Sequence, residues 1–181
     1  MPNVPLILTV GHSTRTIEDF IALLKAHDVE LLVDIRTVPR SRTNPQFNRD
    51  ALPKSLKPAG IDYSHLGALG GLRHAKPDSL NTGWRNTSFR GYADYMQTPE
   101  FSEAIEELME IAQKQQIAIM CAEAVPWRCH RSLVADALWA RGISVEHIMS
   151  ATRRQQHALT SFAKIEGQRV TYPGTERLFQ T

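Results

Sequence analysis

A stretch of eleven residues in the second half of the chain gathers side chains that can do chemistry. It contains Cys121, Glu123, Arg128, Cys129, His130 and Arg131. A thiolate is a nucleophile and a metal ligand, arginine binds anions, and imidazole exchanges protons near neutral pH. The stretch therefore predicts a positively charged site with a reactive thiol.

The residues on either side of this stretch predict a strand-to-helix turn. An apolar run at 117–120 is typical of a buried strand, and apolar residues at 133–138 recur at the spacing of a helix face. We expect the helix to begin near Cys129. Because the first N–H groups of a helix have no partner within it, they would favour a thiolate or a bound anion there.

Three interpretations of the stretch remain open. A cysteine followed by a loop, an arginine and a helix is similar to the phosphate-binding loop of cysteine phosphatases and the sulfur-carrying loop of rhodaneses. The spacing differs, because six residues separate Cys121 from Arg128 and none of them is Gly. The two cysteines and His130, with His12, could instead bind a metal ion, although their spacing forms no CxxC knuckle. In the third interpretation Cys121 is a buried apolar residue and Cys129 only starts a helix.

Two further predicted strands end in polar residues. The apolar run at 5–10 leads into Gly-His-Ser, and the run at 30–35 contains Asp34 and leads into Arg36, with a predicted helix at 17–27 between them. The carboxyl ends of parallel strands meet at one edge of an open α/β sheet. We therefore expect one crevice to hold His12, Ser13, Asp34, Arg36, Cys121 and Glu123.

The order of the predicted elements indicates the fold class. An amphipathic helix is predicted at 99–115 and a strand at 143–149, while 37–86 lose periodicity apart from a short helix at 49–56 and a strand at 61–66. Helical character is predicted to resume at 91–96, and the tail from Ser150 to be weakly packed until Leu178 and Phe179. We predict an α/β fold: a three-layer, doubly wound, mostly parallel sheet with helices on both faces.

The composition is that of an ordinary globular protein. The 181 residues suit one domain, with a core at about 5–150 and a tail at 151–181. A hydrophobic fraction of 42% and a charged fraction of 22% argue against global disorder, and the net charge is only +2. No apolar run approaches the roughly 20 residues of a membrane span. Two cysteines without a secretion signal predict reduced thiols and a cytoplasmic location.

Four separated blocks carry a family resemblance. GHS at 11–13, DIR at 34–36 with VPRS at 38–41, FRGYADYM at 89–96, and CAE at 121–123 with CHRSLVAD at 129–136 together resemble the domain of unknown function 488 family over about 5–150. The resemblance implies a compact α/β domain whose activity is not established, and some members carry labels that connect them with DNA repair. The polar residues it implies as shared are His12, Ser13, Asp34, Arg36, Arg90, Tyr92, Cys121, Glu123, Cys129, His130 and Arg131.

The leading hypothesis is an enzyme whose cationic crevice binds an anionic ligand that contains phosphate or sulfur. Either cysteine would be the nucleophile, a histidine the general acid or base, and a carboxylate would orient the histidine. The predicted catalytic residues are Cys121, Cys129, His130, Glu123 and His12. The predicted ligand-binding residues are Ser13, Asp34, Arg36, Arg90, Tyr92, Arg128 and Arg131.

Two alternatives belong to other functional classes. A nucleic-acid-binding or DNA-repair accessory protein would contact phosphates through basic residues in 36–49 and 74–90, and stack bases on Trp84, Phe89 and Tyr92. A metal-binding protein would use the cysteine and histidine side chains. The expected partner is therefore an anionic small molecule or a nucleic acid, and no association with a membrane is expected. The sequence leaves the cofactor, the reaction and the oligomeric state open.

Overall fold

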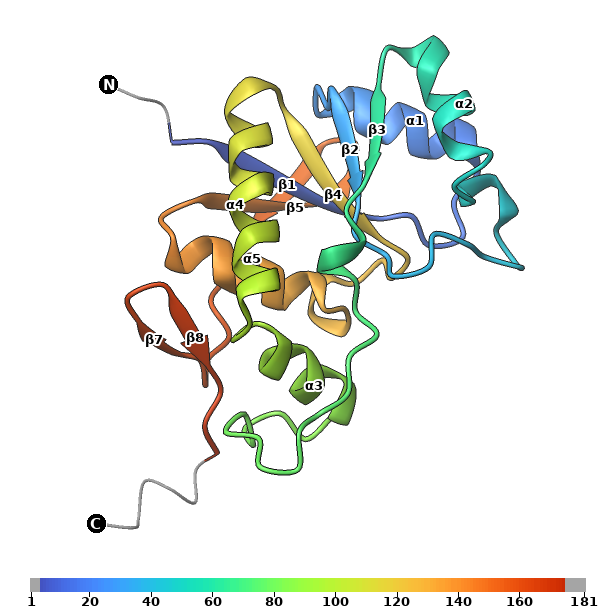
Figure 1. Cartoon of the computed structure of the whole chain (residues 1–181). Helices are drawn as coiled ribbons and strands as arrows, with labels where there is room; N and C mark the ends of the chain where they lie inside the picture. Colours follow the sequence, from blue (N-terminus) through green and yellow to red (C-terminus); the bar gives the residue numbers. More distant parts are fainter. Residues whose placement is uncertain (1–3, 175–181) are drawn as a thin grey trace.

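A central sheet organises the chain in the computed structural model, which describes residues 4–174 (Figure 1). Within that range the sheet has six strands in the order β3-β2-β4-β1-β5-β6. They are β1 (Leu6–Gly11), β2 (Leu31–Asp34), β3 (Asp62–His65), β4 (Ile117–Cys121), β5 (Ser144–Ser150) and β6 (Arg153–Gln156). The first five pair in parallel and β6 is antiparallel to β5. The α/β class with a mostly parallel sheet is confirmed.

The described residues form five helices, three of which begin at a residue whose side chain caps them. They are α1 (Ile17–Ala26), α2 (Leu52–Leu56), α3 (Thr87–Tyr95), α4 (Pro99–Lys114) and α5 (Arg131–Ala140). Short 3-10 turns lie at Pro45–Phe47, Lys57–Ala59, Gly67–Leu69 and Pro126–Arg128. The Thr16 hydroxyl accepts the Asp19 N–H at the start of α1, and Thr98 does the same for the Phe101 N–H at the start of α4. Within 4–174, no helix is long and apolar enough to cross a membrane.

Two apolar clusters cover the strands. Successive residues of β1, β2 and β4 alternate between the two clusters, so β2 and β4 are buried along their whole length. One cluster contains residues of α4 and α5, and the other contains residues of α1 and α2. Burial on both faces explains why these strands are almost continuously apolar in the sequence. The finer description, a doubly wound fold of three layers, stays a prediction.

The register of the parallel strands brings three polar strand ends to one edge. Gly11 at the end of β1 is paired with Cys121 at the end of β4, and Asp34 at the end of β2 is paired with Met120. The ladder continues past the strands, because the His12 N–H donates to the Cys121 carbonyl at 3.0 Å. Strand β4 thus lies between the two strands that come first in the sequence.

Two helix starts differ from those predicted. Helix α5 begins at Arg131 rather than near Cys129, because residues 126–128 form a 3-10 turn and Cys129 has an extended backbone. Helix α3 begins at Thr87 rather than at residue 91, because the Asn86 side chain accepts the N–H groups of Ser88 and Phe89. Both cysteines therefore lie before α5 and not within its first turn.

The prediction of a weakly packed tail is wrong for the residues that the structure describes. Strand β6 pairs with β5, and β7 (Lys164–Glu166) pairs with β8 (Arg169–Thr171) in a second, two-stranded sheet. His157 and Tyr172 are buried and bind the two carboxylate oxygens of Asp136, at 2.8 and 2.7 Å. These contacts attach the tail to α5. Leu178 and Phe179 lie outside the described residues.

Candidate functional site

The loop between β4 and α5 is held against the end of β1. The Ser13 N–H donates to the Ala122 carbonyl at 2.9 Å, next to the contact between His12 and Cys121. Gly11 makes this approach possible, because a Cβ atom there would lie 1.9 Å from the carbonyl oxygen of Glu123. The backbone after Cys121 is therefore fixed by a neighbouring strand.

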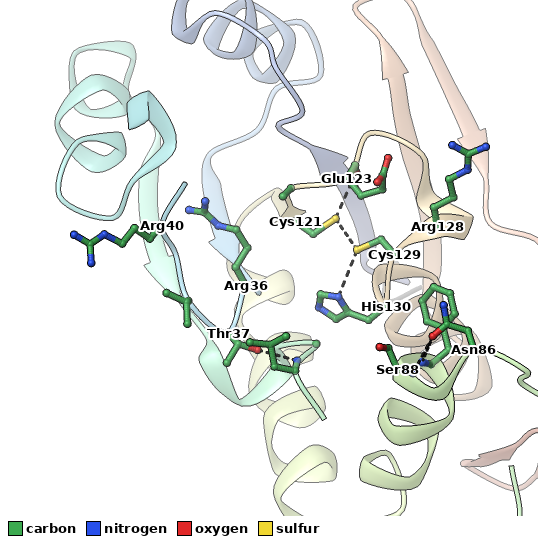
Figure 2. Close-up of a pocket in the computed structure, with 15 residues that line it drawn as sticks. Arg36, Thr37, Arg40, Asn86, Ser88, Cys121, Glu123, Arg128, Cys129 and His130 are labelled. Carbon is green, nitrogen blue, oxygen red and sulfur yellow. Dashed lines mark hydrogen bonds between the residues drawn. The ribbon is translucent and has the colours of Figure 1, made fainter. Parts of the chain in front are cut away.

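Two free thiols lie side by side in this loop (Figure 2). The Sγ atoms of Cys121 and Cys129 are 2.8 Å apart, and Cys129 is the donor in this contact. The residues are 1% and 7% exposed, and both line a cavity of about 450 Å³. Both sulfur atoms therefore lie beside the same cavity.

Arg131 lies behind the sulfur atoms and is completely buried. Its Nη1 donates to the Cys121 Sγ at 3.3 Å and to the Glu123 carbonyl at 3.2 Å, and its Nη2 donates to the Ala124 carbonyl at 3.3 Å. Its Nε has no hydrogen-bond partner among the described residues. In the same part of the chain, no carboxylate lies within 4.0 Å of the guanidinium. The buried cation therefore has a sulfur atom where an ion pair would have a carboxylate.

These contacts shift the pKa values of the two thiols in opposite directions. Burial raises the pKa of a thiol, but at Cys121 the hydrogen bond from Cys129 and the charge of Arg131 outweigh burial and lower its pKa to about 7. The hydrogen bond to Cys121, together with burial, raises the pKa of Cys129 well above its ordinary value. The first proton of the pair is therefore lost near neutral pH, and it comes from Cys121 rather than from Cys129.

His130 faces the second thiol. Its Nε2 lies 3.2 Å from the Ile35 carbonyl, which can only accept, so Nε2 carries the hydrogen and Nδ1 faces the Cys129 Sγ at 3.4 Å. Burial lowers the pKa of His130 to about 4, so the ring is neutral at pH 7. A Cβ atom at Gly71 would lie 2.6 Å from Nδ1, so this ring also depends on a glycine.

The cavity in front of the thiols has more basic than acidic side chains. Arg36, Arg40 and Arg128 line it together with one acidic residue, Glu123. Arg40 and Arg128 are exposed, and Figure 2 shows them on opposite sides of the two sulfur atoms. The cavity is also lined by the polar residues Thr37, Asn86 and Ser88 and by the apolar residues Val38, Leu72 and Phe89.

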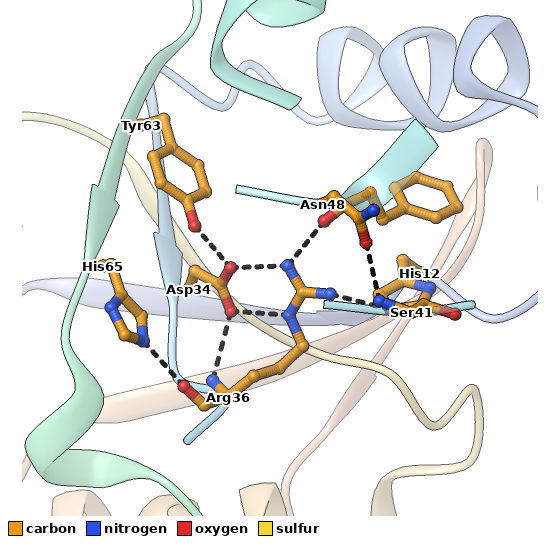
Figure 3. Close-up of polar contacts among 8 residues, drawn as sticks. His12, Asp34, Arg36, Ser41, Asn48, Tyr63 and His65 are labelled. Atoms are coloured by element: carbon orange, nitrogen blue, oxygen red, sulfur yellow. Dashed lines mark hydrogen bonds and ion pairs between the residues drawn. The ribbon is translucent and has the colours of Figure 1, made fainter. Parts of the chain in front are cut away.

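A separate polar cluster lies at the end of β2 (Figure 3). Asp34 is buried and accepts twice from the Arg36 side chain, at 2.9 Å from Nε and at 2.7 Å from Nη2. The Tyr63 hydroxyl donates to the same carboxylate at 2.5 Å, and Arg36 also donates to the Phe47 carbonyl at 2.7 Å. The polar groups of this cluster are occupied by one another.

His12 belongs to the β2 cluster rather than to the thiols. Its Nδ1 donates to the Ser13 carbonyl at 2.8 Å, its Nε2 lies 3.4 Å from Nη1 of Arg36, and its ring stacks on Phe47. Burial is the main cause that lowers its pKa. Both ring nitrogens therefore already have protein partners.

The structure brings together about half of the predicted site residues. Around the cavity lie Cys121, Cys129, His130, Glu123, Arg128 and Arg36. Outside its lining lie His12, Ser13, Asp34, Arg90, Tyr92 and Arg131. Arg90 donates to the Trp84 carbonyl at 3.0 Å, and the fully buried Tyr92 donates to the Leu69 carbonyl at 2.8 Å. Tyr92 thus has no exposed ring face on which a base could stack.

Sequence reasoning missed Thr37, Asn86 and Ser88 as cavity residues. Thr37 follows the Asp-Ile-Arg block directly, so its position after a strand end was a usable signal. Asn86 and Ser88 had no comparable signal, because α3 reaches the cavity only through tertiary packing. For the metal alternative, residues 4–174 contain no group of three or more His, Cys, Asp or Glu side chains arranged to hold a metal ion.

Comparisons with known proteins give one match. The family model described as "Domain of unknown function DUF488" matches residues 16–138, which include three of the four sequence blocks and leave the Gly-His-Ser block outside. Searches of curated proteins and of solved structures find no match. The predicted family is confirmed, and its description names no activity.

Proposed function

The chain belongs to the DUF488 family, and we propose that it is an enzyme that binds an anionic substrate in the cavity and attacks it with the Cys121 thiolate. One observation carries the proposal: the buried Arg131 guanidinium contacts the Cys121 sulfur atom and no carboxylate of the described residues. An uncompensated buried charge costs several kcal/mol. Ionised Cys121 removes that cost, so the fold favours the reactive form of the thiol.

Arg131 in this proposal holds the nucleophile and not the substrate. It contacts Cys121 from the side of the protein interior and is absent from the cavity lining. The charge that an incoming anion meets comes from Arg40 and Arg128, which are exposed; Arg36 also lines the cavity, but its charge is balanced by Asp34. Guanidinium groups match carboxylate and phosphate oxygens, and the hydroxyls of Thr37 and Ser88 add neutral donors.

Cys129 and His130 support the nucleophile. The Cys129 S–H group donates to Cys121 and stabilises its negative charge. Neutral His130 presents Nδ1 to Cys129, so it accepts a hydrogen bond whenever the S–H bond turns away from Cys121. Glu123 also lines the cavity, and its carboxylate reduces the attraction for multiply charged anions.

The proposal is tested by alkylating the reduced protein with two reagents of similar size, iodoacetate and iodoacetamide. A cationic cavity attracts the anionic reagent, so we expect the ratio of the iodoacetate rate to the iodoacetamide rate to exceed that of a small free thiol by about tenfold at low salt. Added salt should reduce this excess, because salt screens exposed charges. The rate should rise with a midpoint near pH 7, the pKa of Cys121.

Mass spectrometry of the alkylated peptides identifies the reactive residue. The Cys121→Ser variant should lose the fast reaction, while Cys129→Ala should keep a reactive thiol with a higher pKa, because alanine has no group that donates to Cys121. A midpoint at or above the value of a free thiol, about 8.5, would contradict the proposal. So would a reagent ratio equal to that of the free thiol.

A further inference from the structure

In the proposed function the second thiol donates a hydrogen bond to the nucleophile but takes no chemical step of its own. Resting on the proposed function, we infer that Cys121 and Cys129 form a dithiol that reduces a small anionic disulfide and ends as an intramolecular Cys121–Cys129 disulfide. The inference rests on geometry: both sulfur atoms line one cavity and are 2.8 Å apart. Transfer of a phosphoryl or acyl group to water would leave Cys129 without a chemical step.

The reaction balances with the groups present. The Cys121 thiolate attacks one sulfur of the substrate disulfide, the substrate S–S bond breaks, and a mixed disulfide forms while the first substrate thiolate leaves. Cys129 then gives its proton to that thiolate and attacks the Cys121 sulfur, which releases the second substrate thiolate. One substrate disulfide is reduced by two electrons and the cysteine pair is oxidised by two. An external dithiol then reduces the pair for the next turnover.

The surroundings of Cys129 suit this second step. While Cys121 is an anion, Cys129 holds its proton to donate to it. Once Cys121 is part of a mixed disulfide, that negative charge is gone, and the Arg131 backbone N–H, which donates to the Cys129 Sγ at 3.4 Å, favours ionised Cys129. Formation of the mixed disulfide therefore activates the thiol that resolves it.

The internal thiol is the preferred attacker of the mixed disulfide. The substrate half of a mixed disulfide occupies the cavity in front of Cys121, so a second outside thiol reaches the Cys121 sulfur atom poorly, whereas Cys129 is already in contact with it. A disulfide bond is about 2.05 Å long, so the two sulfur atoms need to approach by less than about 1 Å. Groups held at such a distance react with effective concentrations far above those of a free reactant.

The cavity limits the substrate. Its volume of about 450 Å³ suits a small molecule, and its basic side chains select for negative charge. We therefore assign the substrate to small disulfides that carry carboxylates. A neutral disulfide of equal size should be a poorer substrate, because it gains nothing from Arg40 and Arg128.

The test mixes the reduced protein with dithiobis(nitrobenzoate), an anionic disulfide whose released thiolate is coloured. The wild-type chain should release two thiolates per protein and retain no label. Peptide mapping should find Cys121 and Cys129 linked to each other. The Cys129→Ser variant should release one thiolate and retain one label on Cys121, and Cys129→Ala serves as a second variant if serine destabilises the fold.

A matched pair of substrates tests the charge requirement. Dithiodiglycolate is anionic and bis(hydroxyethyl) disulfide is neutral, and we expect the wild-type chain to react about tenfold or more faster with the anion at low salt. Equal rates would overturn the assignment of the substrate class.

The outcomes separate this inference from the proposed function. If wild type reacts rapidly with iodoacetate at Cys121 but keeps a stable nitrobenzoate label, the dithiol inference is wrong and the proposed function stands. If Cys121 reacts with neither reagent, both fail. Labels on both cysteines of the wild-type chain, without a link between them, would also overturn the dithiol step.

Discussion

Arg36 and Arg131 are two buried arginines, one just after the end of β2 and the other at the start of α5, and their charges are balanced in different ways. Arg36 is 7% exposed and donates to both carboxylate oxygens of Asp34. Arg131 is fully buried and donates to two backbone carbonyls and to the sulfur of Cys121. Residue type and burial are alike in the two cases, but the partner differs.

Because their partners differ, we assign Arg36 a structural role and, within the proposed function, Arg131 a chemical one. A carboxylate brings its own negative charge, so the Asp34–Arg36 pair is complete, and through the Phe47 carbonyl it fixes the loop after β2 (Figure 3). A thiol brings a charge only after it loses its proton. In the proposed function Arg131 therefore favours the ionised form of Cys121, whereas Arg36 stabilises the fold.

The largest expected effect follows from breaking the complete pair. Asp34→Ala leaves Arg36 buried without a counter-charge and Tyr63 without its acceptor, so we expect the free energy of unfolding to fall by about 3–5 kcal/mol. Urea denaturation followed by circular dichroism measures this change.

A matched control lies on the adjacent strand. Asp62 on β3 is exposed, so Asp62→Ala should change the free energy of unfolding by less than about 0.5 kcal/mol. If Asp34→Ala were as stable as wild type but no longer reacted with iodoacetate, the β2 cluster would belong to the chemical site and the comparison of the two arginines would fail.

The second expected effect depends on pH and concerns Arg131. The pKa of Cys121 in the folded chain, about 7, lies below that of a free thiol, about 8.5. Between these values the unfolded chain binds more protons, so ionisation of Cys121 adds to stability as pH rises from 7 and is lost as pH falls through 7. The contribution reaches about 2 kcal/mol near pH 8.5.

Cys121→Ala removes this contribution. Under reducing conditions, the difference in unfolding free energy between wild type and Cys121→Ala should grow by about 2 kcal/mol from pH 6 to pH 8.5. Cys129→Ala, which keeps Cys121 beside Arg131, should retain part of the pH dependence that Cys121→Ala loses. A constant difference across this range would mean that Arg131 does not favour the thiolate.

Much of the fold was predictable because it depends on burial. Strands β1, β2 and β4 are covered on both faces, so their sequences are apolar runs, and α4 has an apolar face at helical spacing. The tail was not predictable in the same way. Strand β6 has the sequence Arg-Arg-Gln-Gln and is exposed, so its pairing with β5 leaves no apolar signal.

The candidate site was predictable only for residues whose positions follow from the ends of the parallel strands. Parallel register explains why Cys121 lies beside Gly11 and close to Arg36. Strand register does not show which arginine has a carboxylate partner. Arg36 bonds to Asp34, two residues before it, whereas Arg131 bonds to carbonyl groups that the folded loop brings to it. The sequence therefore could not show that Arg131, unlike Arg36, lacks a carboxylate among the described residues.

The smallest expected effect concerns the exposed charges in front of Cys121. Arg40→Ala and Arg128→Ala each remove one cation from the cavity, and exposed charges interact with ligands by about 0.5–1 kcal/mol, so the iodoacetate rate should fall two- to fivefold in each variant. The iodoacetamide rate should stay unchanged, because that reagent carries no charge. Arg42→Ala is the control, since Arg42 is also exposed but does not line the cavity. An equal loss in all three variants would show that the anion responds to the net charge of the protein and not to the cavity.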